Sequence, residues 1–90
     1  MASVSELPEL ALIEVSSTDP ATPNRKLTGT IESRAQKTII LPTREEIVPY
    51  SAIRVQTKHL LSFGEVLSCI RDANTTWKLH ICVERSIMII

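Results

Sequence analysis

The chain has 90 residues, of which 43% are hydrophobic and 22% are charged, and its ten basic residues balance its ten acidic residues. A chain of this length buries one modest core, so we expect a single domain over residues 1–90. With zero net charge and only one Trp, one Tyr and one Phe, nonspecific binding to DNA, RNA or an anionic membrane is not expected.

The N-terminal half alternates between β-prone runs and polar connections. Residues 10–15, LALIEV, and residues 25–32, RKLTGTIE, are predicted strands. The segment 16–24 between them contains two prolines, an Asp and an Asn, which is typical of a loop. A further strand is predicted at 38–41, TIIL. The polar segment 32–37, ESRAQK, is then a turn between two strands, although it lacks Gly, Pro, Asp and Asn.

The C-terminal half carries the clearest strand signals. Apolar and polar residues alternate with period two in 51–57, SAIRVQT, and in 76–84, TWKLHICVE, which is the pattern of half-buried strands. The run 60–70, LLSFGEVLSCI, is a longer predicted strand, and Gly64 marks a bulge or bend within it. Two residues, 58–59, separate the first two of these runs and five residues, 71–75, separate the last two, so hairpins are expected.

Six strands with short links predict an antiparallel all-β fold, because parallel strands need long crossovers. We expect a small six-stranded Greek-key barrel with its core at about residues 9–84, or else a compact sandwich, and a possible short C-terminal helix in ERSIMII. The alternation predicts these core residues: Ile31, Ile39, Leu41, Ile53, Val55, Trp77, Leu79, Ile81 and Val83.

The sequence does not indicate an enzyme, a cofactor or a metal site. His59 and His80 are 21 residues apart and have no partners at zinc-ligand spacing. The only two glycines are 35 residues apart, which excludes the glycine-rich phosphate loops, and no nucleophile-elbow motif is present. Cys69 and Cys82 are interpreted as free thiols in a reducing compartment.

A cytoplasmic location is expected. No apolar run approaches the roughly 20 residues that a membrane span requires. The first residues have no basic region before an apolar stretch, so they do not form a signal peptide.

The order of elements resembles the PilZ domain, a bacterial six-stranded β-barrel. The resemblance covers about residues 27–84 and is strongest where AIRVQT is followed by GEVLSC. It implies a place in cyclic di-GMP signalling, because that family binds this dinucleotide through an R-x-x-x-R motif and a [D/N]-x-S-x-x-G motif. In this chain no two arginines are four residues apart.

The second motif is also altered. Aligning GTIESRAQKTIIL with the strand–turn–strand of the family puts Ser33, Ala35 and Thr38 at the acidic, serine and glycine positions. We therefore expect a non-catalytic regulatory or protein-interaction module in which the ligand motifs are degenerate and dinucleotide binding is weak or absent. Two alternatives stay open. One is an atypical cyclic di-GMP receptor that uses Arg25, Lys26, Arg34 and Ser33. The other is an unrelated small structural β-barrel.

The apolar tail is the predicted partner contact: Ile87, Met88, Ile89 and Ile90. Burying four such side chains is worth roughly 6–10 kcal/mol, which is too much to leave in water. Ile87 and Ile90 could close the end of the barrel while Met88 or Ile89 stays exposed. Alternatively, the tail contacts a homodimer partner or another protein.

Overall fold

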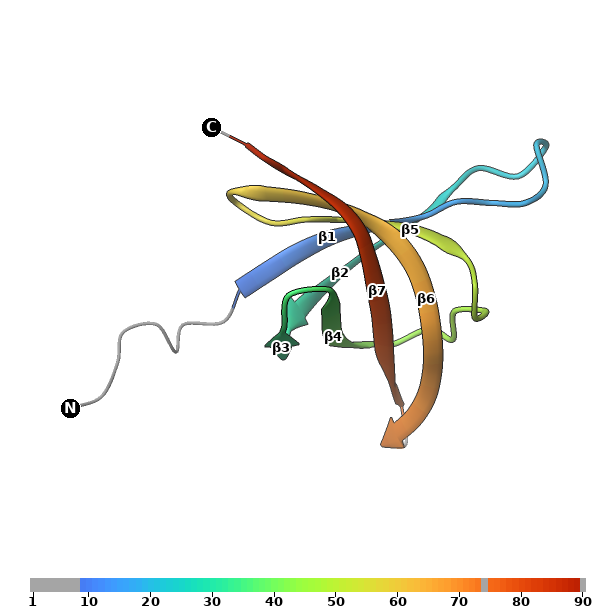
Figure 1. Ribbon diagram of the computed structural model, residues 1–90. Helices are drawn as coiled ribbons and strands as arrows, with labels where there is room; N and C mark the ends of the chain where they lie inside the picture. Colours follow the sequence, from blue (N-terminus) through green and yellow to red (C-terminus); the bar gives the residue numbers. More distant parts are fainter. Residues whose placement is uncertain (1–8, 74, 90) are drawn as a thin grey trace.

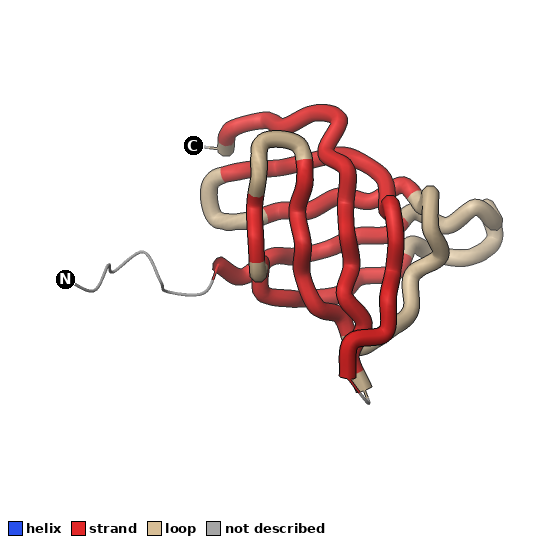
Figure 2. Tube along the Cα trace, turned by 60° about the horizontal axis from the view of Figure 1, so that its bottom comes forward, coloured by secondary structure: helices blue, strands red, loops and turns tan. Residues whose placement is uncertain are grey.

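The computed structural model describes residues 9–73 and 75–89, and the described part contains strands and connections but no helix (Figures 1 and 2). The strands are β1 (Glu9–Val15), β2 (Arg25–Ile31), β3 (Ser33–Arg34), β4 (Thr38–Thr43), β5 (Ala52–Gln56), β6 (Leu60–Ala73) and β7 (Thr76–Met88). No helix in these residues is long and apolar enough to cross a membrane. The predicted all-β class is confirmed.

All seven strands form one antiparallel sheet with the order β2-β1-β5-β6-β7-β4-β3. Strands β5, β6 and β7 are consecutive neighbours, and β4 lies beside β7 rather than beside β5, which is a Greek-key arrangement. Figure 1 shows the sheet curling into a half-barrel, with β7 of the long β6–β7 hairpin running beside β4. Because all the strands belong to one curled sheet, the alternative prediction of a two-sheet sandwich is wrong.

The sheet nearly closes where β2 approaches β4. A methyl group on the Cα of Gly29 would sit 3.1 Å from the carbonyl oxygen of Pro42 and 3.3 Å from Cδ1 of Leu41. The two strands therefore touch without joining in a hydrogen-bonded ladder. Strand β3 pairs only with Ile39 and Ile40 of β4, so no strand in the described part of the chain forms a ladder with Pro42 on the side that faces β2. A proline suits this position because no backbone N–H is needed there.

The core lies on the concave face of the sheet. Six of the nine predicted core residues are buried, and Ile31 and Val83 are partly buried against them. Trp77 is a correction: it is only half-buried, with the Arg71 guanidinium carbon 5.6 Å from its ring centroid. The sequence prediction missed these buried residues: Ala11, Ile13, Val15, Ile47 and Val66.

Two further predictions concern β6 and β7. The irregularity expected at Gly64 is confirmed, since the register of the two strands shifts between Phe63 and Gly64. The possible C-terminal helix is wrong, because β7 continues to Met88, with Ile87 opposite Leu61 and Met88 opposite Leu60. The start of β6 offers this segment a ladder of backbone hydrogen bonds, which an isolated turn of helix cannot match.

Candidate functional site

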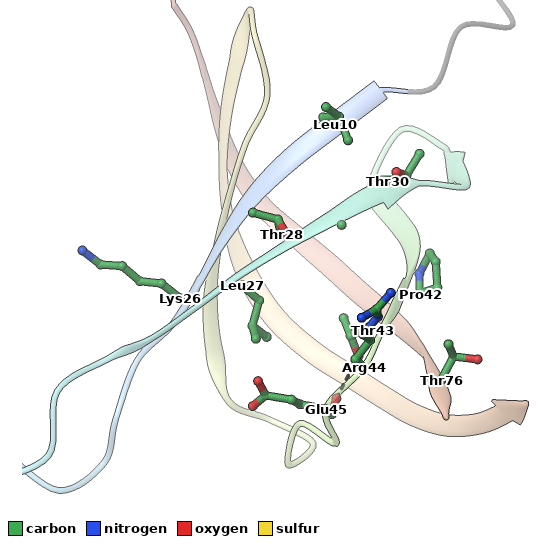
Figure 3. Close-up of a pocket in the computed structure, with 11 residues that line it drawn as sticks. Leu10, Lys26, Leu27, Thr28, Thr30, Pro42, Thr43, Arg44, Glu45 and Thr76 are labelled. Carbon is green, nitrogen blue, oxygen red and sulfur yellow. Dashed lines mark hydrogen bonds between the residues drawn. The ribbon is translucent and has the colours of Figure 1, made fainter. Parts of the chain in front are cut away.

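A hollow with a volume of about 740 Å³ lies at the seam between β2 and β4 (Figure 3). Figure 3 shows the Arg44 side chain within the group that lines it, whereas Lys26 extends away. Thr43 donates a 2.8 Å hydrogen bond to the carbonyl oxygen of Glu45. The hollow offers hydroxyls, one guanidinium and one carboxylate. Its lining residues are Leu10, Lys26, Leu27, Thr28, Gly29, Thr30, Pro42, Thr43, Arg44, Glu45 and Thr76.

Both predicted ligand-binding arginines, Arg25 and Arg34, form ion pairs, and these lie near opposite ends of β2. Arg25 Nη2 lies 2.6 Å from Glu45 Oε1 and 3.3 Å from the carbonyl oxygen of Glu46. Arg34 Nη2 lies 3.2 Å from Glu9 Oε2. The six residue steps of β2 alone span about 20 Å at roughly 3.3 Å per residue, so the two guanidiniums do not converge on one ligand.

Lys26 belongs to a different surface from its neighbour Arg25. It lies opposite Glu14 on β1, on the convex face, and Glu14 also pairs with Arg54 of β5. A hydrogen bond from Asn24 to Glu14 is the main reason that the pKa of Glu14 is lowered. Partial desolvation opposes this shift, and the charges of Arg54 and Lys26 add to it. Lys26 thus joins a row of alternating charges, Lys26–Glu14–Arg54, in which the one carboxylate is already paired with Arg54.

Ser33, the fourth predicted ligand residue, is exposed on β3 opposite Ile40. The polar segment around it forms a tight connection, because the Ala35 N–H donates to the carbonyl oxygen of Thr38 at 2.8 Å. Glu32 binds Lys78 of β7 at 2.9 Å, which fixes the start of the segment. A short β-turn therefore forms without Gly or Asn, and Ser33 lies apart from Arg25 and Lys26.

The metal and thiol chemistry of the described residues is limited. No group of three or more His, Cys, Asp or Glu side chains is placed to hold a metal ion within 9–73 and 75–89. Cys69 and Cys82 are both free and partly buried. The Cys69 Sγ accepts a 3.4 Å hydrogen bond from the N–H of Ile47, so this thiol helps to hold the 44–51 connection against β6.

An apolar band crosses the convex face, where a small soluble domain normally presents polar residues. The register places Leu12, Gln56, Leu61 and Ile87 in one row across β1, β5, β6 and β7. Leu12 is 58% exposed, Ile87 is 47% exposed, and Leu10, two residues along β1, is 71% exposed. We call Leu10, Leu12, Leu61 and Ile87 the outer apolar band.

The outer apolar band borders hollows on both sides of β1. Leu10 and Leu12 line one hollow of about 440 Å³ together with Thr28, Gln56 and Lys58. Leu10 also reaches the seam hollow. The sequence held a signal for this surface, because LALIEV has apolar residues at both alternating sets of positions. One apolar face of β1 packs in the core, and the other, with Leu10 and Leu12, is exposed on the surface.

Tyr50 is the second exposed apolar feature that the sequence prediction missed. Its side chain is 75% exposed, and its backbone adopts a left-handed φ of 69°. The Tyr50 N–H donates to the carbonyl oxygen of Val66 at 2.6 Å, and the Val66 N–H donates to the carbonyl oxygen of Ser51 at 3.0 Å. These two bonds with β6 hold an unfavourable backbone conformation that a bulky residue rarely adopts.

The predicted partner-contact tail is an extended strand end. Ile87 and Met88 are exposed, and the Ile89 N–H donates to the carbonyl oxygen of His59 at 2.8 Å. Ile90 lies outside the described residues. The tail therefore continues the sheet, and its outward-facing residue Ile87 belongs to the outer apolar band.

Comparison with models of known protein families and with curated proteins found no match for this chain.

Proposed function

We propose that the chain is a non-catalytic, PilZ-like regulatory module of bacterial cyclic di-GMP signalling that works in the cytoplasm by binding another protein. The outer apolar band is the observation that carries the proposal. Burying a Leu or Ile side chain contributes roughly 1.5–3 kcal/mol, and three members of this band, Leu10, Leu12 and Ile87, are exposed on the sheet. The hollows beside β1 give apolar side chains of a partner places to insert.

Weak or absent dinucleotide binding is the second part of the proposal. Arg25 and Arg34 each hold a carboxylate, and the segment 32–38 has Ser33, Ala35 and Thr38 at the family's ligand positions. A guanine ligand would have to break these ion pairs before it gained bidentate bonds of its own. The curled antiparallel all-β sheet is compatible with the barrel that the PilZ resemblance implies.

The protein-binding part is tested by photocrosslinking in a bacterial lysate. A photoreactive phenylalanine analogue replaces Leu12, and Glu46, which is exposed on the 44–51 connection, carries the same analogue as the matched control. We expect a discrete adduct with one other protein from position 12 only, and loss of this adduct in the Leu10→Lys variant. Equal labelling from both positions, or no adduct from position 12, contradicts the proposal.

The ligand part is tested separately by calorimetry with cyclic di-GMP. We expect no saturable heat at micromolar ligand. Stoichiometric binding tighter than about 10 μM, which corresponds to roughly −7 kcal/mol, would favour the atypical receptor instead. In that case Arg25→Ala and Arg34→Ala should each weaken binding about tenfold or more, because each removes a charge-assisted bond.

A further inference from the structure

The last part of β7 is an open sheet edge. Strand β4 pairs with β7 only as far as Cys82, opposite Thr38, and the next contact is the Val83 N–H donating to the carbonyl oxygen of Lys37 at 2.8 Å. Figure 1 shows β7 continuing past the β3–β4 turn toward the C-terminus. Within the described residues, no strand lies beside 84–88 on this side, and all five of these residues are exposed.

The backbone groups on this edge are directed outward. The Ile89 N–H donates to the carbonyl oxygen of His59, which lies just before β6. Because the direction of backbone groups alternates along a strand, the backbone N–H and C=O of Ile87 also point toward β6. The N–H and C=O groups of Ser86 and Met88 therefore point away from β6. No backbone partner for either residue exists in the described part of the chain. Unpaired groups in this arrangement form a template for one more strand.

We propose that this edge pairs with the same edge of a second copy of the chain, antiparallel and about a two-fold axis at Ser86. Two identical edge strands related by an axis normal to the sheet run antiparallel, which continues the pattern of the whole sheet. In an antiparallel pair, residues that lie directly opposite each other have their side chains on the same face of the sheet. A two-fold axis between two consecutive residues would pair side chains on opposite faces, so the axis must pass beside a residue that pairs with its own copy. An axis at Ser86 uses the whole free segment 84–88.

Charge favours this register over the two registers whose axis lies at Glu84 or Arg85. An axis at Arg85 would place two arginines directly opposite each other, and an axis at Glu84 would place two glutamates there, which is destabilising. With the axis at Ser86, Arg85 faces Ile87 of the second copy and Glu84 faces Met88 of the second copy. Among the axes at Glu84, Arg85 and Ser86, only the axis at Ser86 avoids like charges directly opposite each other. Because the segment is short, the dimer is expected to be weak.

The first test removes one hydrogen-bond donor from the edge. Met88→Pro deletes an N–H that points away from β6 and blocks an incoming strand, and proline is tolerated at such edge positions. Met88→Leu keeps the N–H and is the matched control. Sedimentation equilibrium of the full chain from about 1 μM to about 1 mM should show a monomer–dimer equilibrium that weakens at least tenfold in Met88→Pro and persists in Met88→Leu.

The second test reads the register. Ile87→Glu places a carboxylate opposite Arg85 of the second copy, whereas Ile87→Arg places two like charges together at each of two symmetric positions. The dimer dissociation constant should be at least about fivefold higher for Ile87→Arg than for Ile87→Glu. Circular dichroism of each variant checks that the strands are retained.

Each outcome decides the proposal. A single monomeric mass for the natural chain across this range overturns it, as does a dimer that survives Met88→Pro or shows equal affinity with Glu and Arg at position 87. The inference goes beyond the proposed protein partner, because it depends on the backbone groups of Ser86 and Met88, which lie outside the outer apolar band, although Ile87 belongs to both surfaces. Leu12→Lys leaves this edge intact, so failure of one proposal is distinguishable from failure of the other.

Discussion

Gly64 of β6 lies directly against Cys82 of β7, and a methyl group on its Cα would overlap the Cys82 carbonyl oxygen. The overlap arises at the register shift, where β7 supplies an extra residue and its backbone bends toward β6. The bend allows one 13-residue strand to pair with both β4 and β6 while the sheet curls.

Gly64→Ala should therefore lower the free energy of unfolding by about 2–4 kcal/mol, because the backbone of β7 must shift to admit the methyl group. Gly29→Ala is the control, since its methyl group would meet Pro42 at 3.1 Å and needs only a small adjustment. We expect that change to stay within about 1 kcal/mol. Urea denaturation curves measure both, and equal effects would contradict the difference in contact.

Substitutions at the buried Leu79 and at the half-exposed Trp77 of β7 should lower the free energy of unfolding by different amounts in the same assay. Leu79 is fully buried, so Leu79→Ala is expected to cost about 2–5 kcal/mol through the lost burial and the cavity. Trp77 is half-exposed beneath Arg71, so Trp77→Ala is expected to cost only about 1–2 kcal/mol despite the larger side chain. A tryptophan variant that is less stable than the leucine variant would place the indole in the core after all.

The left-handed backbone of Tyr50 predicts opposite effects for two substitutions. Tyr50→Gly relieves the steric conflict and should leave the melting temperature unchanged or raise it. Tyr50→Val introduces a β-branched residue that adopts this φ poorly and should cost about 1–2 kcal/mol. Both variants keep the N–H that donates to Val66. Thermal unfolding followed by circular dichroism compares them, and the reverse ranking would exclude strain at this residue.

The carboxyl of Glu14 should respond to loss of its amide partner. Asn24→Ala removes the hydrogen bond that contributes most to the lowered pKa of Glu14, so this pKa should rise toward the ordinary value of 4.5. Carboxyl-carbon NMR titration measures it. Thr22→Ala in the same loop is the control, because it removes a hydrogen bond to Asp19 and should raise the pKa of Asp19 only.

This shift also has a definite sign in stability. A group whose folded pKa is lowered adds stability above its unfolded pKa, and this contribution is lost as the pH falls through the folded value. In the natural chain, the contribution of Glu14 is therefore present above pH 4.5 and disappears in more acidic solution. Asn24→Ala should flatten the acid side of the stability profile. An unchanged acid limb would show that the hydrogen bond does not persist in solution.

The sequence predicted the features that depend on local pattern. Alternation located the buried faces of β5 and β7, and Gly64 marked the bulge, because side-chain period and glycine content are properties of short segments. The features it missed depend on which strands become neighbours. The 20-residue separation between Arg25 and Glu45 hides their ion pair, which exists only once β2 and β4 meet at the seam.

The outer apolar band could not be predicted from the sequence for a related reason. Leu12, Leu61 and Ile87 are far apart in sequence, and only the register of three strand pairs brings them into one row. The two-residue strand β3 is too short to show any periodicity. Ile47 is buried although it lies in a connection, because Cys69 holds its backbone against β6.

The Greek-key order also determines when the fold can form during protein synthesis. Strand β4 is complete once Thr43 has been added, but its ladder with β7 extends to Cys82, so this ladder cannot be completed until nearly forty further residues have been added. Until then the only strand paired with β4 among the described residues is the two-residue β3. Residues 1–82 must therefore be synthesised before the fold can close, and during that interval the apolar face of β4 is exposed to aggregation.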